Sequence, residues 1–138
     1  MLRLSKKVDY AIILLVHLGR VSKPVSAQEI ASHYLLPQPM VANILKQLSS
    51  AGMIESKRGQ QGGYCLDQSP DRITLSDIIQ VIDGSFTLVE CVRSRDDCKV
   101  QESCPTQNSL LALHSKLEGF MTSITLRELI EPQTELCL

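Results

Sequence analysis

The chain contains no tryptophan, and only 4% of its 138 residues are aromatic. A core with so few rings must be filled by aliphatic side chains, which is typical of packed helices. Hydrophobic residues make up 43% of the chain, enough for a modest core. The length predicts one domain, or one small domain with an extension.

Long apolar runs and targeting features are also missing. The apolar run at residues 11–18 is far too short to span a bilayer, and the start MLRLSKKVDY lacks the layout of a signal peptide. We therefore expect a cytoplasmic protein, a setting in which structural disulfides are uncommon. The sequence shows no nucleophile–base arrangement and no phosphate-binding loop, so we expect no enzyme.

The chain has little net charge, −1 at neutral pH, which by itself argues against a nucleic-acid partner. This average hides an asymmetry. Residues 1–64 carry eight Lys or Arg against three Asp or Glu, a balance of +5, whereas residues 65–138 carry six against twelve, a balance of −6. A basic half joined to an acidic half favours nucleic-acid contact through the basic half, with chance charge scatter as the alternative.

What the chain does contain is a cysteine-dense segment, CVRSRDDCKVQESC, at residues 91–104. Six residues separate Cys91 from Cys98, and five separate Cys98 from Cys104. The intervening residues are polar or charged apart from two valines, a composition typical of a ligand loop rather than a core. The total of five cysteines is odd, which disfavours a simple disulfide framework and favours metal binding or thiol chemistry.

Three helices are predicted in the basic half. The first has Ser5 as its N-cap and runs to about Gly19. The second starts at the S-x-x-E capping box of residues 26–29, and the third begins around Pro37 and ends at a glycine, Gly52. Two short helices linked by a tight turn after a longer helix fit a helix-turn-helix.

The next stretch predicts a hairpin with a basic tip. Residues 53–57 and 64–66 read as short strands around the sequence RGQQGG. A hairpin directly after a helix-turn-helix is the wing of a winged-helix domain, although ordinary α+β domains also contain hairpins. Arg58, Gln60 and Gln61 at the tip can donate to phosphate or enter a minor groove.

The acidic half predicts three further helices. Thr74 begins a capping box for a short helix that ends at Gly84. Apolar residues then recur every three or four positions from Leu110 to Ile124, which predicts a helix of about twenty residues, roughly 30 Å long. We expect a symmetric partner helix to cover this apolar face, with folding back onto its own domain as the alternative. A capping box at Thr125 predicts a short last helix, followed by a loose tail at 132–138.

Several stretches together carry a family resemblance. They are the start MLRLSKKVDYA, the wing RGQQGGY, the segment ITLSDIIQVIDG, the three spaced cysteines and the late ITLREL. In this order they resemble the winged-helix repressors that sense iron–sulfur clusters or nitric oxide, the IscR/NsrR type of the Rrf-two family. The resemblance implies a mainly α fold with a small β-hairpin: a winged helix-turn-helix, a long dimerisation helix and a homodimer. The chain looks most like regulators of the sulfur-mobilisation pathway of iron–sulfur assembly.

The resemblance also implies an iron–sulfur cluster, with [2Fe–2S] favoured over [4Fe–4S]. Cluster iron favours thiolate sulfur, and Cys91, Cys98 and Cys104 supply three of the four ligands such a cluster needs. Assembly regulators carry a histidine three positions after the last cysteine, where this chain has Gln107, a poor ligand. Nitric-oxide-sensing relatives place an acidic ligand, from the first helix of the partner subunit, where this chain has Asp9, so Asp9 is our first candidate.

Alternatives to this cluster site stay open. Asp9 is equally well read as a surface carboxylate at a helix N-terminus. An exogenous ligand ranks after Asp9, and His114 and His33, better read as structural residues, rank last. The three cysteines are also compatible with zinc, or with reactive thiols that oxidise to a disulfide. Of the other two cysteines, Cys65 reads as a small core residue of the wing strand, and Cys137 in the tail has no evident partner.

The third predicted helix is expected to lie in a major groove. Gln38, Asn43 and Lys46 are its polar positions, and amide side chains can read adenine while lysine reaches guanine or phosphate. Phosphate positioning suits Ser5, Lys6 and Arg58 better. The full predicted set of DNA contacts is Ser5, Lys6, Gln28, Gln38, Pro39, Asn43, Lys46, Arg58, Gln60 and Gln61.

These observations predict a dimeric, DNA-binding transcriptional repressor that senses cluster or redox status and controls iron–sulfur assembly genes. Its parts are a DNA-binding domain at 1–84, a cluster-binding loop at 85–105, and a dimerisation helix with a tail at 106–138. A nitric-oxide sensor, or a cluster-free thiol- or zinc-responsive repressor of the same fold, is the first alternative. A redox or electron-transfer protein that uses the same cysteines is the second, and the basic half disfavours it.

Overall fold

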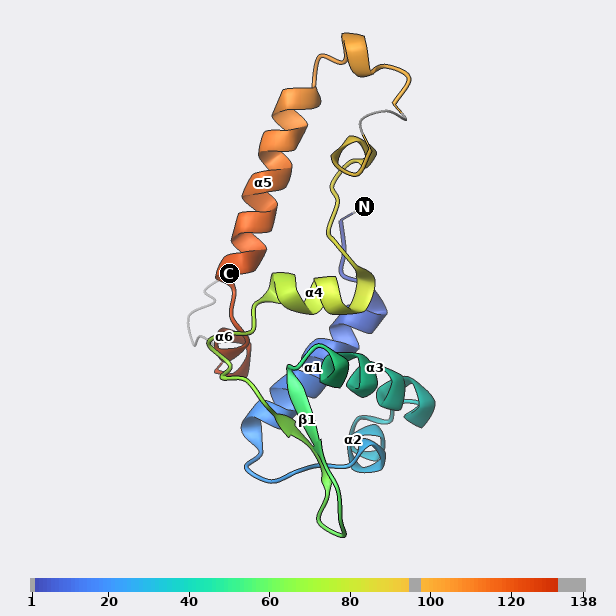
Figure 1. Cartoon of the computed structure of the whole chain (residues 1–138), viewed down its shortest axis with the longest axis vertical. Helices are drawn as coiled ribbons and strands as arrows, with labels where there is room; N and C mark the ends of the chain where they lie inside the picture. Colours follow the sequence, from blue (N-terminus) through green and yellow to red (C-terminus); the bar gives the residue numbers. More distant parts are fainter. Residues whose placement is uncertain (1, 95–97, 132–138) are drawn as a thin grey trace.

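The computed structural model describes residues 2–94 and 98–131 (Figure 1). Its elements are α1 (Lys6–Arg20), α2 (Ala27–Tyr34), α3 (Gln38–Ser50), β1 (Ile54–Lys57), β2 (Gly63–Leu66), α4 (Leu75–Asp83), α5 (Gln107–Ser123) and α6 (Leu126–Ile130), with 3₁₀ turns at Glu90–Val92 and Gln101–Ser103. The predicted class, mainly α with a two-stranded hairpin, is confirmed. The tail at 132–138, with Cys137, lies outside the described residues. Within them, no helix is both long and apolar enough to cross a membrane.

The predicted helix starts are confirmed by their capping hydrogen bonds. The Ser5 hydroxyl oxygen accepts the Val8 N–H of α1 at 3.1 Å. At the start of α2, the Ser26 hydroxyl accepts the Glu29 N–H, and the Glu29 carboxylate accepts the Ser26 N–H. Thr74 and Asp77 make the same reciprocal pair before α4. Each pair satisfies backbone donors that the first helical turn leaves without partners, so the start of each helix is encoded locally.

The core of the winged helix-turn-helix is aliphatic. Helices α1, α3 and α4 pack against one another, and α2 packs on α3. The largest side chains in this core are fully buried: Leu14 and Leu15 of α1, Ile30 of α2, Ile44, Leu45 and Leu48 of α3, and Ile78 of α4. Each such side chain contributes about 1.5–3 kcal/mol by leaving water. This core fixes the orientation of α3 and leaves its opposite face free.

The wing is an antiparallel hairpin that pairs Ile54 with Leu66 and Lys57 with Gly63. Its second strand also pairs with the chain before α2, because Tyr64 and Val25 exchange backbone hydrogen bonds of 2.7 and 3.0 Å. A side chain at Gly63 would bring its Cβ within 2.5 Å of the Val25 backbone, so this close approach requires glycine. The pairing holds the wing beside the helix-turn-helix.

Helix α5 is packed far less than the other helices. Figure 1 shows it rising away from α1, α2 and α3, while the chain after α4 runs up beside it and turns back into its N-terminus. Of its 17 residues only His114 is buried, whereas Leu113 and Phe120 are 45% and 63% exposed. The predicted long helix is therefore present, and most of its apolar face is uncovered within one chain.

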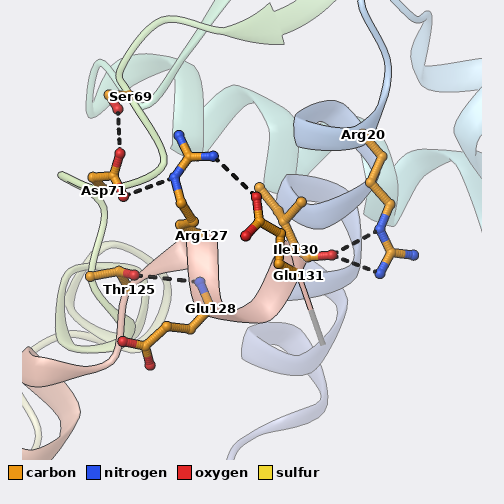
Figure 2. A network of polar contacts seen from close by, with 8 residues as sticks. All are labelled: Arg20, Ser69, Asp71, Thr125, Arg127, Glu128, Ile130 and Glu131. Carbon is orange, nitrogen blue, oxygen red and sulfur yellow. Dashed lines mark hydrogen bonds and ion pairs between the residues drawn. The ribbon is translucent and has the colours of Figure 1, made fainter. Parts of the chain in front are cut away.

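The last helix, α6, returns to the DNA-binding domain. Leu126 is fully buried, and its N–H donates to the Ile73 carbonyl at 2.8 Å. Figure 2 shows the Arg20 guanidinium of α1 donating to the Ile130 carbonyl, at 3.0 and 3.3 Å. The same figure shows Arg127 paired with Asp71 at 2.8 Å and with Glu131 at 3.5 Å. These contacts attach the C-terminal end of α5 to the domain that carries α3.

Candidate functional site

The exposed face of α3 carries the polar residues expected to read DNA. Gln38, Pro39, Asn43 and Lys46 are all exposed, while Val41, Ile44, Leu45 and Leu48 on the opposite face are buried. Residues 38, 42 and 46 lie four positions apart, so they form one row along the helix. Asn43 lies beside this row and offers both a donor and an acceptor. The row is free to enter a groove of DNA.

A groove beside this row includes a residue that the sequence did not single out. Ala42, Asn43, Lys46 and Gln47 line it from α3, and Val81 lines it from α4. The Gln47 side-chain oxygen is buried and accepts no hydrogen bond within the described residues. No local signal marks Gln47, because its environment depends on the packing of α4 against α3.

The wing tip forms the second exposed polar surface. Arg58, Gln60 and Gln61 are exposed, as predicted from the sequence RGQQGG. A depression beside the tip is also lined by Lys23, in the loop between α1 and α2. In the sequence Lys23 stands out only as a charge, since nothing local shows that the loop meets the wing. Lys23 and Glu29 both line this depression, and Arg58 is exposed at the wing tip.

The remaining predicted DNA contacts lie at helix starts. Lys6 and Gln28 are exposed in the first turns of α1 and α2. Ser5 is half-buried, and its hydroxyl oxygen already accepts the Val8 N–H, which leaves the hydroxyl proton for a phosphate. Ser5 therefore has a structural role whether or not it contacts DNA.

The three cysteines of residues 91–104 lie in a loop made of short turns. Cys91 is in the 3₁₀ turn Glu90–Val92, and Cys104 follows the 3₁₀ turn Gln101–Ser103. Cys98 precedes that second turn, and its carbonyl accepts the Gln101 N–H at 3.3 Å. All three thiols are half-buried and free of disulfides. The loop thus presents three separate thiols without a core of its own.

Cys104 and Cys65 lie in opposite electrostatic settings. The Thr106 hydroxyl, 3.6 Å from the Cys104 sulfur, and the backbone N–H groups of Thr106 and Gln107 lower the pKa of Cys104. Burial and the Glu55 carboxylate, 3.4 Å away, raise the pKa of Cys65. Cys65 is half-buried in β2 rather than part of the core. The start of α5 favours a thiolate at Cys104, and the wing disfavours one at Cys65.

The loop's chemistry fits cluster iron, although one chain does not gather the ligands. Three free thiols, one with a lowered pKa, are the donor set that an iron–sulfur cluster requires. Within the described ranges, no three His, Cys, Asp or Glu residues are arranged to hold a metal ion. Asp9 is exposed in the first turn of α1, and Gln107 begins α5. A complete site requires rearrangement of the loop or a ligand from elsewhere.

The two histidines weighed as ligands are both engaged in other contacts. The His114 Nδ1 accepts the Leu88 N–H at 3.4 Å, and its Nε2 lies 3.7 Å from the Glu118 carboxylate. His33 is in α2, with its ring 5.4 Å from the His17 ring. Burial, followed by the charge of His33, lowers the pKa of His17. These contacts agree with the structural role that the sequence analysis favoured for both.

Comparison with known proteins places this geometry in a family. The family model of Rrf2, described as an iron-dependent transcriptional regulator, matches residues 4–132. The chain belongs to the Rrf2 family. The resemblance found in the sequence is confirmed, and with it the winged helix-turn-helix fold. Rrf2 proteins are DNA-binding transcriptional regulators, so the chain is a regulator and not an enzyme.

Individual relatives agree with this assignment. The HTH-type transcriptional regulator IscR of Cronobacter sakazakii is 29% identical over 134 residues, covering 96% of this chain and 82% of its own length. Among solved structures, CymR, the global cysteine regulator of B. subtilis, is 27% identical with a TM-score of 0.77, covering 96% of this chain and 99% of CymR. IscR of T. potens is 31% identical with a TM-score of 0.68, covering 94% of this chain and 87% of that protein.

Proposed function

We propose that the chain is a homodimeric repressor whose affinity for its operator depends on an iron–sulfur cluster held by residues 91–104. The observation that carries this proposal is the combination of two features in one Rrf2 chain: an exposed polar row on α3 and three free thiols in one loop. Residues 1–84 bind DNA, 85–105 hold the cluster, and 106–138 form the dimerisation helix and tail. The regulated genes are those of iron–sulfur assembly, in the cytoplasm.

On DNA, α3 enters the major groove and the wing contacts the backbone. Asn43 and Gln38 can each form a bidentate pair with adenine, and Lys46 can reach guanine. Arg58, Gln60 and Gln61 lie at the wing tip, where they suit phosphate and minor-groove contacts. Two copies related by a two-fold axis then read a palindromic operator.

The dimer is proposed from the uncovered apolar side of α5. An apolar pocket lies between the N-terminal arm, α4 and α5, lined by Leu4, Phe86, Leu117 and Met121 among others. Phe120 and Leu113 project from α5 into solvent in a single chain. Exposed apolar surface of this kind marks an interaction site, and a second α5 has the complementary apolar face.

The cluster is proposed to bind Cys91, Cys98 and Cys104, with Asp9 of the partner subunit as the fourth ligand. When bound, a [2Fe–2S] cluster supplies a redox- and oxygen-sensitive centre. The chain's part is to hold the three thiols in one loop directly before α5. A site with one oxygen ligand is labile, which suits a sensor whose shape changes when the cluster is lost.

One observation favours an alternative function. The described residues gather no metal-binding group of three, and the relative CymR is named as a cysteine regulator. The alternative is a repressor of the same fold in which the cysteines respond as free thiols; zinc binding by these cysteines would need the same gathering of ligands as a cluster. A nitric-oxide sensor differs from the proposal only in the signal that the cluster detects.

The DNA-binding part of the proposal is tested by salt dependence. Arg58→Ala should weaken binding to every sequence and lower the slope of log affinity against log salt by about 1. Asn43→Ala should cost about 1–3 kcal/mol and relax specificity at one base pair while keeping the slope. Lys116→Ala, an exposed lysine on α5, is the control that changes neither. Equal salt slopes for Arg58→Ala and the parent would contradict the role of the wing.

A further inference from the structure

One buried polar side chain stands out on the poorly packed α5. His114 is 7% exposed, and within the described residues it is the single buried side chain that is polar or charged. It is also the one buried residue of α5. A polar ring that is buried on an otherwise exposed helix implies specific partners, because burial without them costs free energy.

Those partners come from the chain that leads to Cys91. The rings of Phe86 and His114 stack with centroids 5.4 Å apart and planes 3° apart. The Leu88 N–H donates to His114 Nδ1 at 3.4 Å. Because Nδ1 accepts, the neutral ring carries its proton on Nε2, which faces the Glu118 carboxylate at 3.7 Å. The imidazole is thus held by the stack with Phe86 and by the hydrogen bond at Nδ1.

This contact is the long-range attachment of the cysteine loop. Among the hydrogen bonds of the described residues, the one from Leu88 to His114 alone joins residues 85–105 to a distant part of the chain. The others formed by this segment run to residues at most four positions away. The position of the arm before Cys91 therefore depends on His114 and on the packing of Phe86 against the core.

The distances along the chain match this role. From His114 back to Gln107, α5 rises about 10 Å, at 1.5 Å per residue. The three residues from Leu88 to Cys91 span at most about 11 Å when extended. Because Cys91 lies in the 3₁₀ turn Glu90–Val92, this segment would have to extend to bring Cys91 level with the N-terminus of α5, beside which Cys104 lies. Without the hydrogen bond, the nearest fixed point is Phe86, which packs against the core, and Cys91 could then range over about 17 Å.

We propose that His114 is a positioning residue that holds the Cys91 arm on α5 and so keeps Cys91 near Cys104. The role rests on the proposed function, since it serves a cluster that the cysteines share. His114 acts through Leu88 and Phe86 and is not itself a ligand. It also links the loop to the dimerisation helix, so cluster loss and movement of α5 are coupled through one side chain.

Two substitutions separate the two contacts of the ring. His114→Phe keeps an aromatic ring against Phe86 but removes the acceptor for the Leu88 N–H. His114→Asn keeps an acceptor near the position of Nδ1 and loses the stack. Since a hydrogen bond is worth about 0.5–1.5 kcal/mol, amide exchange at Leu88 should be about two- to tenfold faster in His114→Phe, with partial rescue in His114→Asn. His33→Phe, at an exposed position of α2, is the matched control and should match the parent.

Hydrogen exchange is measured first on reduced, metal-free protein, so that it does not depend on a cluster. Unchanged exchange at Leu88 in His114→Phe would overturn the anchor. If that variant does not fold, hydrogen exchange of the parent protein provides the test. The Leu88 amide should then exchange more slowly than the amides of Thr87 and Val89. Equal exchange of the three amides would overturn the proposal.

The second readout is the rate at which anaerobically purified protein loses iron and sulfide in air. His114→Phe should lose them several-fold faster than the parent, with rescue by His114→Asn. Equal rates in all three proteins would overturn the positioning role even if exchange at Leu88 had risen. A parent that contains no iron or sulfide would refute the proposed function instead, while the exchange result would still decide whether His114 anchors the arm.

Discussion

The DNA-binding domain and α5 differ sharply in how they use their apolar residues. Helix α1 buries five of its 15 residues and α3 buries four of 13, whereas α5 buries one of 17. The buried residues of α1 and α3 form a closed aliphatic core within one chain. Helix α5 leaves Leu113 and Phe120 exposed to water. The difference shows that residues 2–84 have their packing partners within the chain, while α5 keeps exposed apolar surface that the proposed second copy would cover.

The two regions also differ in charge. The basic excess lies in residues 1–64 and the acidic excess in residues 65–138. A basic α3 and wing suit phosphate, while an acidic second half is kept away from DNA by repulsion. In the proposed function the chain separates DNA reading from sensing, and α6 and the arm before Cys91 connect the two parts.

The largest expected effect comes from the core of the DNA-binding domain. Leu45→Ala removes a fully buried side chain of α3 and should lower the free energy of unfolding by about 2–5 kcal/mol. The control is Leu113→Ala on α5, which is 45% exposed and should cost far less at concentrations where the protein is monomeric. Urea unfolding at low concentration measures both. Equal losses would contradict the contrast between the two regions.

The next largest effect concerns the proposed dimer interface on α5. Phe120→Ser should weaken the dimer by about tenfold or more, because exposed aromatic residues dominate such interfaces. The thermal stability of the monomer should stay unchanged, since Phe120 is 63% exposed in one chain. Sedimentation equilibrium of the variant, beside Lys116→Ala as control, measures the change. An unaltered dimer would show that another surface joins the subunits.

A smaller effect tests the attachment of α6 to α1. A Cβ at Gly19 would meet the Ile130 side chain, so Gly19→Ala should destabilise the protein by about 1–3 kcal/mol through overpacking. Ile130→Val removes the Cδ1 methyl group that a Cβ at Gly19 would meet, so the double variant should recover part of the lost stability. Thermal unfolding of the four proteins gives the coupling energy. Strict additivity would mean that the two side chains do not meet.

The smallest effect is the pH dependence of the ion pair in Figure 2. The Arg127 guanidinium holds the pKa of Asp71 below its ordinary value. Its contribution to stability is therefore present above the unfolded pKa of about 3.9 and is lost as pH falls through the folded pKa. Because both side chains are exposed, the contribution is small. Arg127→Ala should raise the pKa of Asp71, measured by carbon NMR; an unmoved titration would contradict the pairing.

Local features of the fold were predictable from the sequence. Ser5, Ser26 and Thr74 cap helices by bonds to residues three positions away, and apolar spacing marks the buried faces of α1 and α3. The exposed polar face of α3 follows from the same spacing. These features depend on neighbouring residues, so they can be read without a structure.

The features that depend on distant contacts were not predictable. Arg20 bonds to a carbonyl 110 positions away, and His114 receives a hydrogen bond from a residue 26 positions earlier. His114 lies four residues after Leu110 and three before Leu117, so the apolar spacing places it on the buried face, but nothing nearby in the sequence identifies its partners. The fourth cluster ligand is harder still, because Asp9 would act from a second subunit. The site was therefore predicted as a set of residue types, but its assembly was not.

The most direct test of the central claim is anaerobic purification followed by measurement of iron, sulfide and operator affinity in the same sample. The parent should be coloured and contain iron and sulfide, and Cys98→Ala should lose both and bind the operator with altered affinity. Cys65→Ala should behave like the parent, since that thiol lies in the wing. A colourless, iron-free parent whose operator affinity is unchanged by Cys98→Ala would contradict the account.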